Sequence, residues 1–342
     1  MQVFELGERA IVERIRKLLG NPDIGDDCGF IRIGDEILVA TSDMLHQKTD
    51  FPPQMSGYQI GWMSAAVSLS DLAAMGAKPT GMLFAIGLPG DTETGFLDEI
   101  IRGIKTCADH ASTRVIGGDL DAHDELTIVG TAIGSVKREN IMYRSGAREN
   151  DLVCVTGSLG GAGAALFALK QGIKCPADLL AKLFEPTPRI REGSTLAESK
   201  AVTSAMDISD GLAASLHELS RANENIGFKI YAEKIPTHPK ISQMLKPKEA
   251  LKVALYEGGD FELLFTVPKE KIKILHEEID LTIIGKVTKK NILIEETTIE
   301  GKTCVKPLNE KGYEHLRHRP QTRSHPQDPI TDTNTKFDIT KY

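Results

Sequence analysis

Short sequence motifs rich in aspartate, glycine and serine recur at the ends of the strands that this sequence predicts. This recurrence restricts the fold more than any other feature, and we call these segments the aspartate motifs. In chain order the aspartate motifs span 24–27, 41–43, 117–119 and 207–211. In open α/β sheets, the loops at strand ends are where ligands usually bind. We therefore expect one acidic site formed by the carboxylates of these motifs, which are Asp26, Asp27, Asp43, Asp119, Asp207 and Asp210.

A predicted helix over 57–75 adds one more acid. Its apolar residues follow helical spacing, and Ser64, Ser68 and Asp71 form a separate polar stripe. Two carboxylates about 4 Å apart repel by roughly 4 kcal/mol at an effective dielectric of about 20, and divalent cations remove that cost. Because Mg²⁺ prefers oxygen ligands, the whole set predicts a multi-metal phosphate site. The alternative for any single residue is an ordinary loop or helix-cap aspartate.

A charged stretch near 137–150, which contains Arg-Ser-Gly at 144–146, is expected to be the boundary between two regions of the chain. The first region, 1–140, is expected to contain helices at 7–19, 57–75 and 94–110 and strands at 28–33, 36–41, 113–116 and 126–136, with 117–119 as a loop. The second region, 141–316, is expected to contain strands at 151–156, 202–207, 227–232, 260–267 and 281–288, alternating with helices that end near 171, 184, 199 and 223. Such alternation is typical of α/β folds. The polar segment 317–342 is expected to be disordered.

Composition excludes several classes of protein. The chain has 342 residues with 48 acidic and 41 basic side chains, and its net charge of −7 argues against a nucleic-acid or anionic-membrane binder. It has no apolar run of the roughly 18 residues that a membrane helix needs, no signal pattern and no C-x-x-C pair, so we expect a cytoplasmic protein. The P-loop, nucleophile-elbow and H-E-x-x-H motifs are also absent from the sequence, which leaves metal-assisted chemistry.

The aspartate motifs and the segment Ser-Asp-Leu-Ala-Ala-Met-Gly-Ala at 70–77 resemble those of the thiamine-monophosphate kinases. These kinases are a family of the aminoimidazole ribonucleotide synthetase superfamily. The segments Arg-Ser-Gly-Ala at 144–147 and Asp-Phe-Glu-Leu at 260–263 extend the resemblance, which runs from about residue 7 to residue 316 in the family's order. It implies a two-domain α/β (α+β) architecture of the PurM-like type. The N-terminal domain would bind ATP and Mg²⁺ and pair its sheet in a homodimer, and the C-terminal domain would be an α/β sandwich.

The same resemblance implies ATP-dependent phosphorylation of thiamine monophosphate to thiamine diphosphate, with ATP as co-substrate and several Mg²⁺ ions. The positions that match magnesium contacts in the family are Asp27, Thr41, Ser42, Asp43, Asp71, Asp119, Asp207 and Asp210. The positions that match ATP contacts are Gly118, Asp119, Arg144 and Ser209. No covalent intermediate or general base is expected, because the acceptor is already an anion and the obstacle is charge repulsion.

The chain departs from the family pattern only on the acceptor side. Asp50 stands where many bacterial members have a substrate-contacting histidine, Gly259 stands at the position of a substrate-contacting glutamate, and Glu310 replaces a tryptophan. Asp50 and Glu257 could face the cationic thiazolium of the acceptor, or they could be solvated loop acids. Two alternative functions therefore remain. One is a sister enzyme with another acceptor, and the other is a non-catalytic Mg-nucleotide-binding regulatory module.

Overall fold

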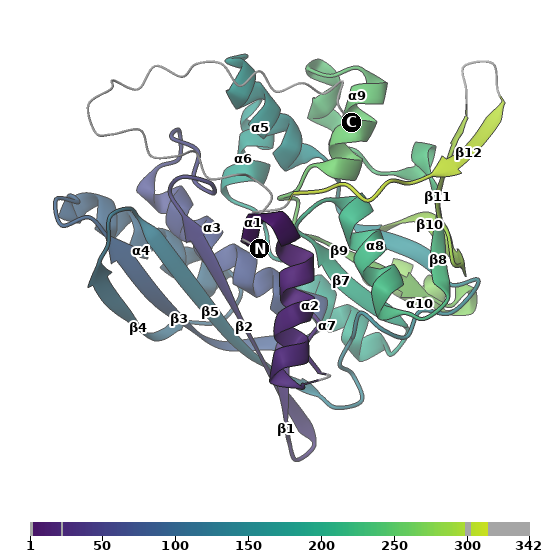
Figure 1. Cartoon of the computed structure of the whole chain (residues 1–342), viewed down its shortest axis with the longest axis horizontal. Coiled ribbons are helices and arrows are strands. Elements are labelled where there is room, and N and C mark those ends of the chain that lie inside the picture. Colours follow the sequence, from purple (N-terminus) through teal and green to yellow (C-terminus); the bar gives the residue numbers. More distant parts are fainter. Residues whose placement is uncertain (1–2, 22, 298–301, 314–342) are drawn as a thin grey trace.

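The computed structural model describes residues 3–21, 23–297 and 302–313, which form two β-sheets with helices between and around them (Figure 1). The five-stranded sheet has the order β1-β2-β5-β3-β4, and the seven-stranded sheet has the order β12-β11-β8-β10-β6-β9-β7. Both sheets are mostly antiparallel, with β3–β4 and β8–β11 as the parallel pairs among the described strands. The mixed α and β composition and the two-sheet architecture expected from the sequence are confirmed.

The N-terminal half contributes the smaller sheet and its helices. Its elements are α1 (Val3–Leu6), α2 (Glu8–Leu19), β1 (Gly29–Ile33), β2 (Glu36–His46), α3 (Gly57–Ala74), β3 (Lys78–Leu88), α4 (Thr94–His110), β4 (Val115–Ala122) and β5 (Thr127–Lys137). The elements of the larger sheet and its surroundings are β6 (Leu152–Thr156), α5 (Gly161–Gln171), α6 (Ala177–Phe184), α7 (Ile190–Ser199), β7 (Ser204–Ile208), α8 (Leu212–Ala222), β8 (Ile226–Tyr231), α9 (Pro247–Tyr256), β9 (Glu262–Val267), α10 (Ile272–His276), β10 (Leu281–Lys289), β11 (Ile292–Thr297) and β12 (Thr303–Pro307).

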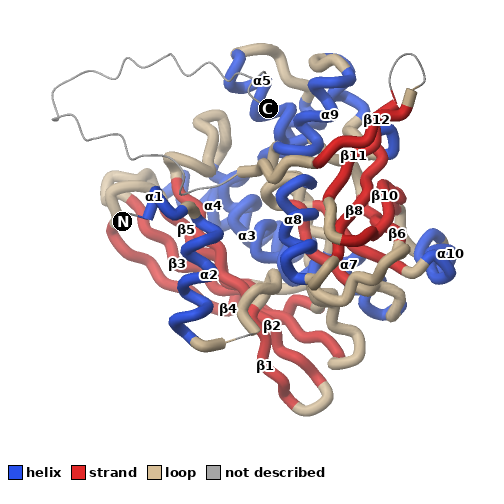
Figure 2. Tube along the Cα trace, turned by 45° about the vertical axis from the view of Figure 1, so that its right-hand side comes forward, coloured by secondary structure: helices blue, strands red, loops and turns tan. Residues whose placement is uncertain are grey.

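Helix α3 lies at the centre of the molecule, between the two sheets (Figures 1 and 2). It packs against β2 and β5 of the smaller sheet, against α4 and α7, and against β7 of the larger sheet. Two glycines permit its close crossing with α4, because a Cβ on Gly61 would lie 1.9 Å from the Ile100 carbonyl oxygen and one on Gly103 would lie 1.9 Å from the Tyr58 carbonyl oxygen. The expected polar stripe of α3 is therefore enclosed, and its serines Ser64 and Ser68 are buried.

Two expectations about strand ends are wrong. Strand β2 continues to His46, so Asp43 lies inside the strand, and β4 includes the Gly117–Asp119 segment that was expected to be a loop. Aspartate is disfavoured within strands by propensity. Here the Ser68 hydroxyl compensates Asp43 by donating to its carboxylate. Every residue of β4 is solvent-exposed at the sheet edge, where glycine and aspartate leave no buried group unsatisfied.

Helical periodicity gives the better expectations. The helix expected over 94–110 is α4, and the helix expected over 7–19 begins at residue 8. Helix α9 and the hairpin β11–β12 were not expected. The expected disordered tail, 317–342, lies outside the described residues. None of the helices in the described ranges combines the length and hydropathy needed to cross a bilayer.

Candidate metal and phosphate site

Four aspartates from distant parts of the sequence meet beside α3. Asp71 comes from α3 itself, Asp43 from β2, Asp207 from the end of β7, and Asp27 from the segment before β1. Carboxylate oxygens of Asp27, Asp71 and Asp207 all lie within 4.8 Å of one another. Asp43 is close enough that its charge acts on Asp71. The expected convergence of the acids therefore occurs, but it occurs where α3 meets both sheets and not along one row of strand ends.

Hydroxyl groups fix the rotamers of three of these carboxylates. The Thr41 hydroxyl donates to Asp71 at 2.6 Å. Two buried serines of α3 hold two further carboxylates. Ser68 donates to Asp43 and Ser70 donates to Asp207, each at 2.7 Å. The cluster is thus held in place before any ligand arrives, which is how proteins preorganise sites for charged ligands.

The electrostatics of the cluster demand a counter-charge. Burial raises the pKa of Asp207 to about 8, and the charge of Asp27 contributes to the shift. The pKa of Asp71 is raised well above its usual range by burial and then by the charges of Asp43, Asp207 and Asp27. Burial likewise raises the pKa of Asp43. A cation with several oxygen ligands would reverse these shifts, so the donor set fits a hard divalent metal ion.

Arg144 supplies positive charge at the edge of the cluster. Its guanidinium donates to Asp27 at 2.8 Å, and its backbone N–H donates to Asp26 at 2.6 Å. Burial lowers the pKa of Arg144, but the charge and hydrogen bond of Asp27 outweigh burial and raise it, so the group stays cationic. Its Nε is buried and makes no hydrogen bond to any described residue. An orphan donor of this kind, on a guanidinium that already pairs with Asp27, is placed to donate to an oxygen atom of a bound anion.

Ser209 and Asp210 follow directly after β7, at the border of a cavity of about 570 Å³. The Ser209 carbonyl accepts from the backbone of Gly259 at 2.7 Å, and the Asp210 carbonyl accepts from the backbone of Tyr313 at 3.2 Å. Arg144 also lines this cavity, whose outer wall is made by α2 and α8. The residues that are candidates for binding phosphate therefore border a space that is large enough for a small ligand.

Three predicted site residues point elsewhere. The register pairs Gly118 with Phe84, Phe84 with Gly130, and Gly130 with Asp43, so Gly118 shares the face of Asp43 but lies three strands away. At about 4.8 Å per strand, that separation is about 14 Å. Asp119 and Ser42 face the opposite, open side of the sheet, where Ser42 shares a 2.6 Å hydrogen bond with Thr131. The chain alone therefore does not bring Gly118, Asp119 or Ser42 into the cluster.

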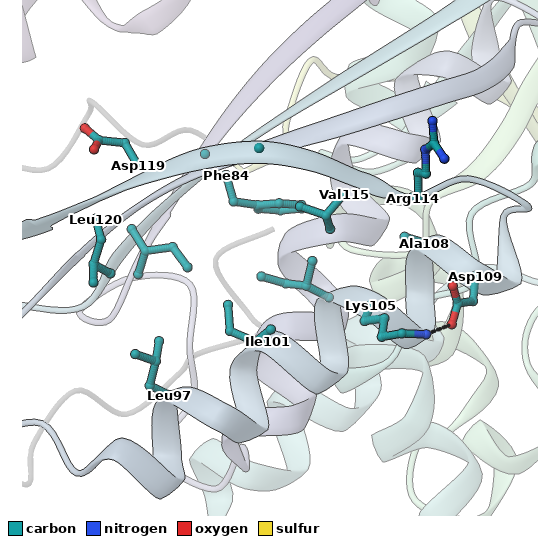
Figure 3. A pocket seen from close by; sticks show the side chains of 14 residues that line it. Phe84, Leu97, Ile101, Lys105, Ala108, Asp109, Arg114, Val115, Asp119 and Leu120 are labelled. Carbon is teal, nitrogen blue, oxygen red and sulfur yellow. Dashed lines mark hydrogen bonds and ion pairs between the residues drawn. The ribbon is translucent and has the colours of Figure 1, made fainter.

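Gly118 borders a second cavity, a groove of about 790 Å³ between β4 and α4 (Figure 3). Its walls are mostly apolar and include Phe84, Ile101 and Leu120. A Cβ at Gly118 would lie 2.0 Å from the Phe84 carbonyl oxygen, so only glycine fits there. Asp119 reaches the rim of the groove with its carboxylate turned away from α4 (Figure 3).

The four acceptor candidates differ in their surroundings. Asp50 accepts from the backbone of His46 at 2.9 Å and from the Thr49 hydroxyl at 2.7 Å, so it closes its own turn. Glu310 is exposed and forms ion pairs with Arg9 and Arg221, at the surface between α2 and α8. Its carboxylate is therefore committed to a surface network and does not replace an aromatic ring.

Glu257 and Gly259 lie in the segment that packs against the Ser209–Gly211 loop. Burial raises the pKa of Glu257, whose side chain rests against Gly163 at the start of α5. Gly259 has a positive φ of 91°, a backbone conformation in which a side chain is strained. A glutamate at 259 would therefore require a different local backbone.

Sequence reasoning missed two groups. Ser70 is the buried donor to Asp207, and the signal for it was its position directly before Asp71 in α3. Tyr313 lines the cavity next to Asp210, and no periodicity or spacing pointed to it because it lies in an irregular C-terminal segment.

Comparison with known proteins identifies the class first. Residues 25–136 match the N-terminal domain of AIR synthase related proteins, and residues 148–296 match the C-terminal domain. The chain is thus a two-domain protein related to AIR synthase.

The particular family follows from relatives that match nearly the whole chain. The thiamine-monophosphate kinase of Methanospirillum hungatei is 42% identical over 310 residues, which cover 91% of this chain and 99% of that protein. The Pyrococcus abyssi enzyme of the same name is 36% identical, covering 92% and 97%. The solved structure of AaThiL complexed with AMPPCP and TMP has a TM-score of 0.81 at 28% identity, covering 92% of this chain and 99% of that one. The chain belongs to the thiamine-monophosphate kinase family, so the resemblance inferred from the aspartate motifs is confirmed.

Proposed function

We propose that this protein catalyses the ATP-dependent phosphorylation of thiamine monophosphate to thiamine diphosphate. The observation that carries the proposal is the preorganised carboxylate cluster of Asp27, Asp71 and Asp207, with the orphan Nε of Arg144 beside it. A cluster of this kind has no stabilising role of its own, because its members repel one another. The names of the relatives and the ligands of the AaThiL structure support the same reaction.

Asp27, Asp43, Asp71 and Asp207 are the residues that would hold Mg²⁺, and Asp210 would join a further ion from the loop after β7. Bound Mg²⁺ would neutralise the phosphate oxygens that otherwise keep two anionic substrates apart. Thr41 acts by holding Asp71 in its rotamer. Arg144 would donate from Nε to a phosphate oxygen, and Ser209 would contact the nucleotide from the border of the cavity. No residue needs to remove a proton from the acceptor, because a phosphate oxygen is the nucleophile.

The nucleotide base would occupy the apolar groove between β4 and α4, in contact with Gly118. We assign the sheet of region 1–140 to a homodimer interface, because its open face carries exposed apolar side chains. Ile31, Ile33 and Met44 are 64%, 59% and 62% exposed, and the register places them on one face. Asp119 and Ser42 lie on the same face and would meet the second subunit, so their roles as metal contacts depend on dimer formation.

A product assay tests the proposal. Purified protein is incubated with Mg-ATP and thiamine monophosphate, and the nucleotides and thiamine phosphates are separated by chromatography. We expect thiamine diphosphate and ADP in equal amounts. Release of ADP only with a different phosphorylated acceptor would favour a sister enzyme of the superfamily. Nucleotide binding without turnover of any acceptor would favour a regulatory module and refute the proposal. The cytoplasmic location stays a prediction.

A further inference from the structure

Residues 257–261, called here the crossing segment, run directly over the loop that follows β7, 209–211. The Gly259 N–H donates to the Ser209 carbonyl at 2.7 Å. A Cβ on Gly258 would lie 2.3 Å from the same carbonyl oxygen, so only glycine allows this close contact. The backbone of the crossing segment therefore sets where the loop lies.

The backbone of the crossing segment is strained. Gly259 has a positive φ of 91°, and Phe261 has one of 49°. This left-handed conformation is unfavourable for a residue with a Cβ, so phenylalanine keeps it only where its surroundings hold it there. The Phe261 N–H donates to the Ile208 carbonyl at 3.0 Å, and the phenylalanine is buried. Asp260 lies between the two left-handed residues, so an anchor on its side chain fixes the backbone on both sides.

Asp260 is anchored on the start of α5. Its carboxylate is buried and accepts from the Gly160 N–H at 2.6 Å and from the Ala162 N–H at 3.3 Å. Backbone amides at a helix start lack a partner within the helix and often bind an anion, and here the Asp260 carboxylate takes that place. The glycine-rich turn 157–163, which joins β6 to α5, therefore anchors the crossing segment.

The loop under the crossing segment reaches the metal site. Ser209 and Asp210 line the cavity of about 570 Å³, and the charge of Asp210 acts on Asp207 of the carboxylate cluster. Asp260 is absent from the described residues that line either cavity. Any effect of Asp260 on the metal site must therefore pass through the crossing segment. Because ligand geometry has to be held to within about 0.5 Å, a displaced loop would weaken metal binding.

We propose that Asp260 is a positioning residue for the reaction, which holds the loop of Ser209 and Asp210 beside the metal site by fixing the crossing segment to the start of α5. The inference rests on the proposed function, in which Asp210 joins a further Mg²⁺ ion. It gives a role to the glycine-rich turn, whose helix-start amides bind an internal carboxylate and so hold the loop without touching a substrate.

The Mg²⁺ dependence of turnover tests the inference. Asp260→Ala removes both acceptor oxygens, so it should raise the Mg²⁺ concentration for half-maximal turnover by about tenfold. Asp260→Asn keeps one acceptor and should raise it by less than about threefold. Asp151→Ala is the matched control, because Asp151 is also buried and accepts from the Arg148 N–H at 3.0 Å and from the Thr203 hydroxyl at 2.6 Å. The control should leave the Mg²⁺ dependence unchanged.

Combination with Asp210→Asn separates positioning from a general loss of stability. If Asp260 acts through Asp210, the double variant Asp260→Ala with Asp210→Asn should need no more than about twice the Mg²⁺ that Asp210→Asn alone needs. Independent sites would instead multiply their effects, and that result would overturn the inference. The same Mg²⁺ dependence in Asp260→Ala and in the wild type would also overturn it.

Gly160→Ala tests the anchor from its other side and decides the question if Asp260→Ala does not fold. Gly160 has a φ of 79°, and a Cβ there would lie 3.0 Å from the Ala254 nitrogen, so alanine displaces the donor and leaves Asp260 in place. The half-maximal Mg²⁺ concentration should rise by at least about threefold. An unchanged value in Gly160→Ala would overturn the inference.

Nucleotide binding distinguishes failure of this inference from failure of the proposed function. ADP is titrated calorimetrically into the wild type and each variant over a series of Mg²⁺ concentrations, and this measurement needs no turnover. Asp260→Ala should raise the Mg²⁺ concentration that supports half-maximal ADP affinity by about tenfold, and Asp151→Ala should not. A wild type that makes no thiamine diphosphate would refute the proposed function alone. Equal Mg²⁺ dependence of ADP binding in Asp260→Ala and the wild type would overturn the inference alone.

Discussion

Replacing Asp71 with asparagine separates the energetic and chemical consequences of the carboxylate cluster. Oxygen atoms of Asp71 lie within 4.8 Å of those of Asp27 and Asp207. At that distance and an effective dielectric of about 20, each pair of charges repels by about 3–4 kcal/mol. Water and partial protonation reduce this sum. We therefore expect Asp71→Asn to raise the free energy of unfolding of the metal-free protein by about 1–3 kcal/mol, because asparagine keeps an oxygen that can accept from Thr41.

The assay is thermal unfolding in EDTA and in excess Mg²⁺, paired with turnover. For domains of 150–250 residues, 1 kcal/mol shifts Tm by roughly 2–4 °C, so the variant should melt a few degrees higher than the wild type in EDTA. Mg²⁺ should stabilise the wild type and have a smaller effect on the variant. Turnover should fall at least about a thousandfold, which corresponds to about 4 kcal/mol of transition-state stabilisation. Asp280→Asn, which changes an exposed acid directly before β10, outside both cavities, is the control. A variant that melts lower in EDTA, or that turns over normally, would refute the reasoning.

Three further predictions concern the structure around the site. Glu262 is buried and accepts two hydrogen bonds from Arg189, each at 2.6 Å, and one from Lys182 at 3.2 Å. Glu262→Ala should therefore lower the free energy of unfolding, measured in urea, by about 3–5 kcal/mol, because it leaves buried positive charges without their partner. A loss below about 1 kcal/mol would show that Arg189 and Lys182 are solvated independently of Glu262. Burial raises the pKa of Asp260 to about 7. Because a raised pKa means that the folded state keeps a proton that the unfolded state has lost, Asp260 should reduce stability as the pH rises from about 4 to about 7. The isosteric Asp260→Asn should flatten the pH dependence of Tm in that window, and an unchanged slope would contradict the assignment. Met44→Asp, on the open face of the smaller sheet, should convert a dimer into monomers in light scattering after gel filtration, whereas a wild-type monomer would contradict the proposed interface.

Sequence patterns determined the helices well because their faces are set locally. The spacing of Ile100, Ile104 and Ala108 alone defines α4, and all three side chains are buried. The strand that contains Asp43 was cut short because its polar residues read as a strand end, although the compensating donor is Ser68, which is 25 residues away in sequence. Propensity cannot register a donor that only the tertiary structure supplies.

The acids of the site were predictable as a set, and their arrangement was not. Asp27, Asp71 and Asp207 were expected to converge, and they do. Which face of the sheet Asp119 occupies depends on register, and one residue of shift reverses it. The place of Tyr313 at the cavity was not predicted because its contacts are with Asp210 and Thr49, which lie more than 100 residues away in the sequence.

A single-turnover experiment with γ-³²P-ATP tests the central claim most directly. Enzyme in excess over labelled ATP is mixed with thiamine monophosphate, with and without Mg²⁺, and then quenched in acid. Direct transfer between two metal-bound phosphates predicts that the label passes into thiamine diphosphate only when Mg²⁺ is present, with none left on the protein. Label retained on the denatured protein, or transfer that proceeds equally in EDTA, would contradict it.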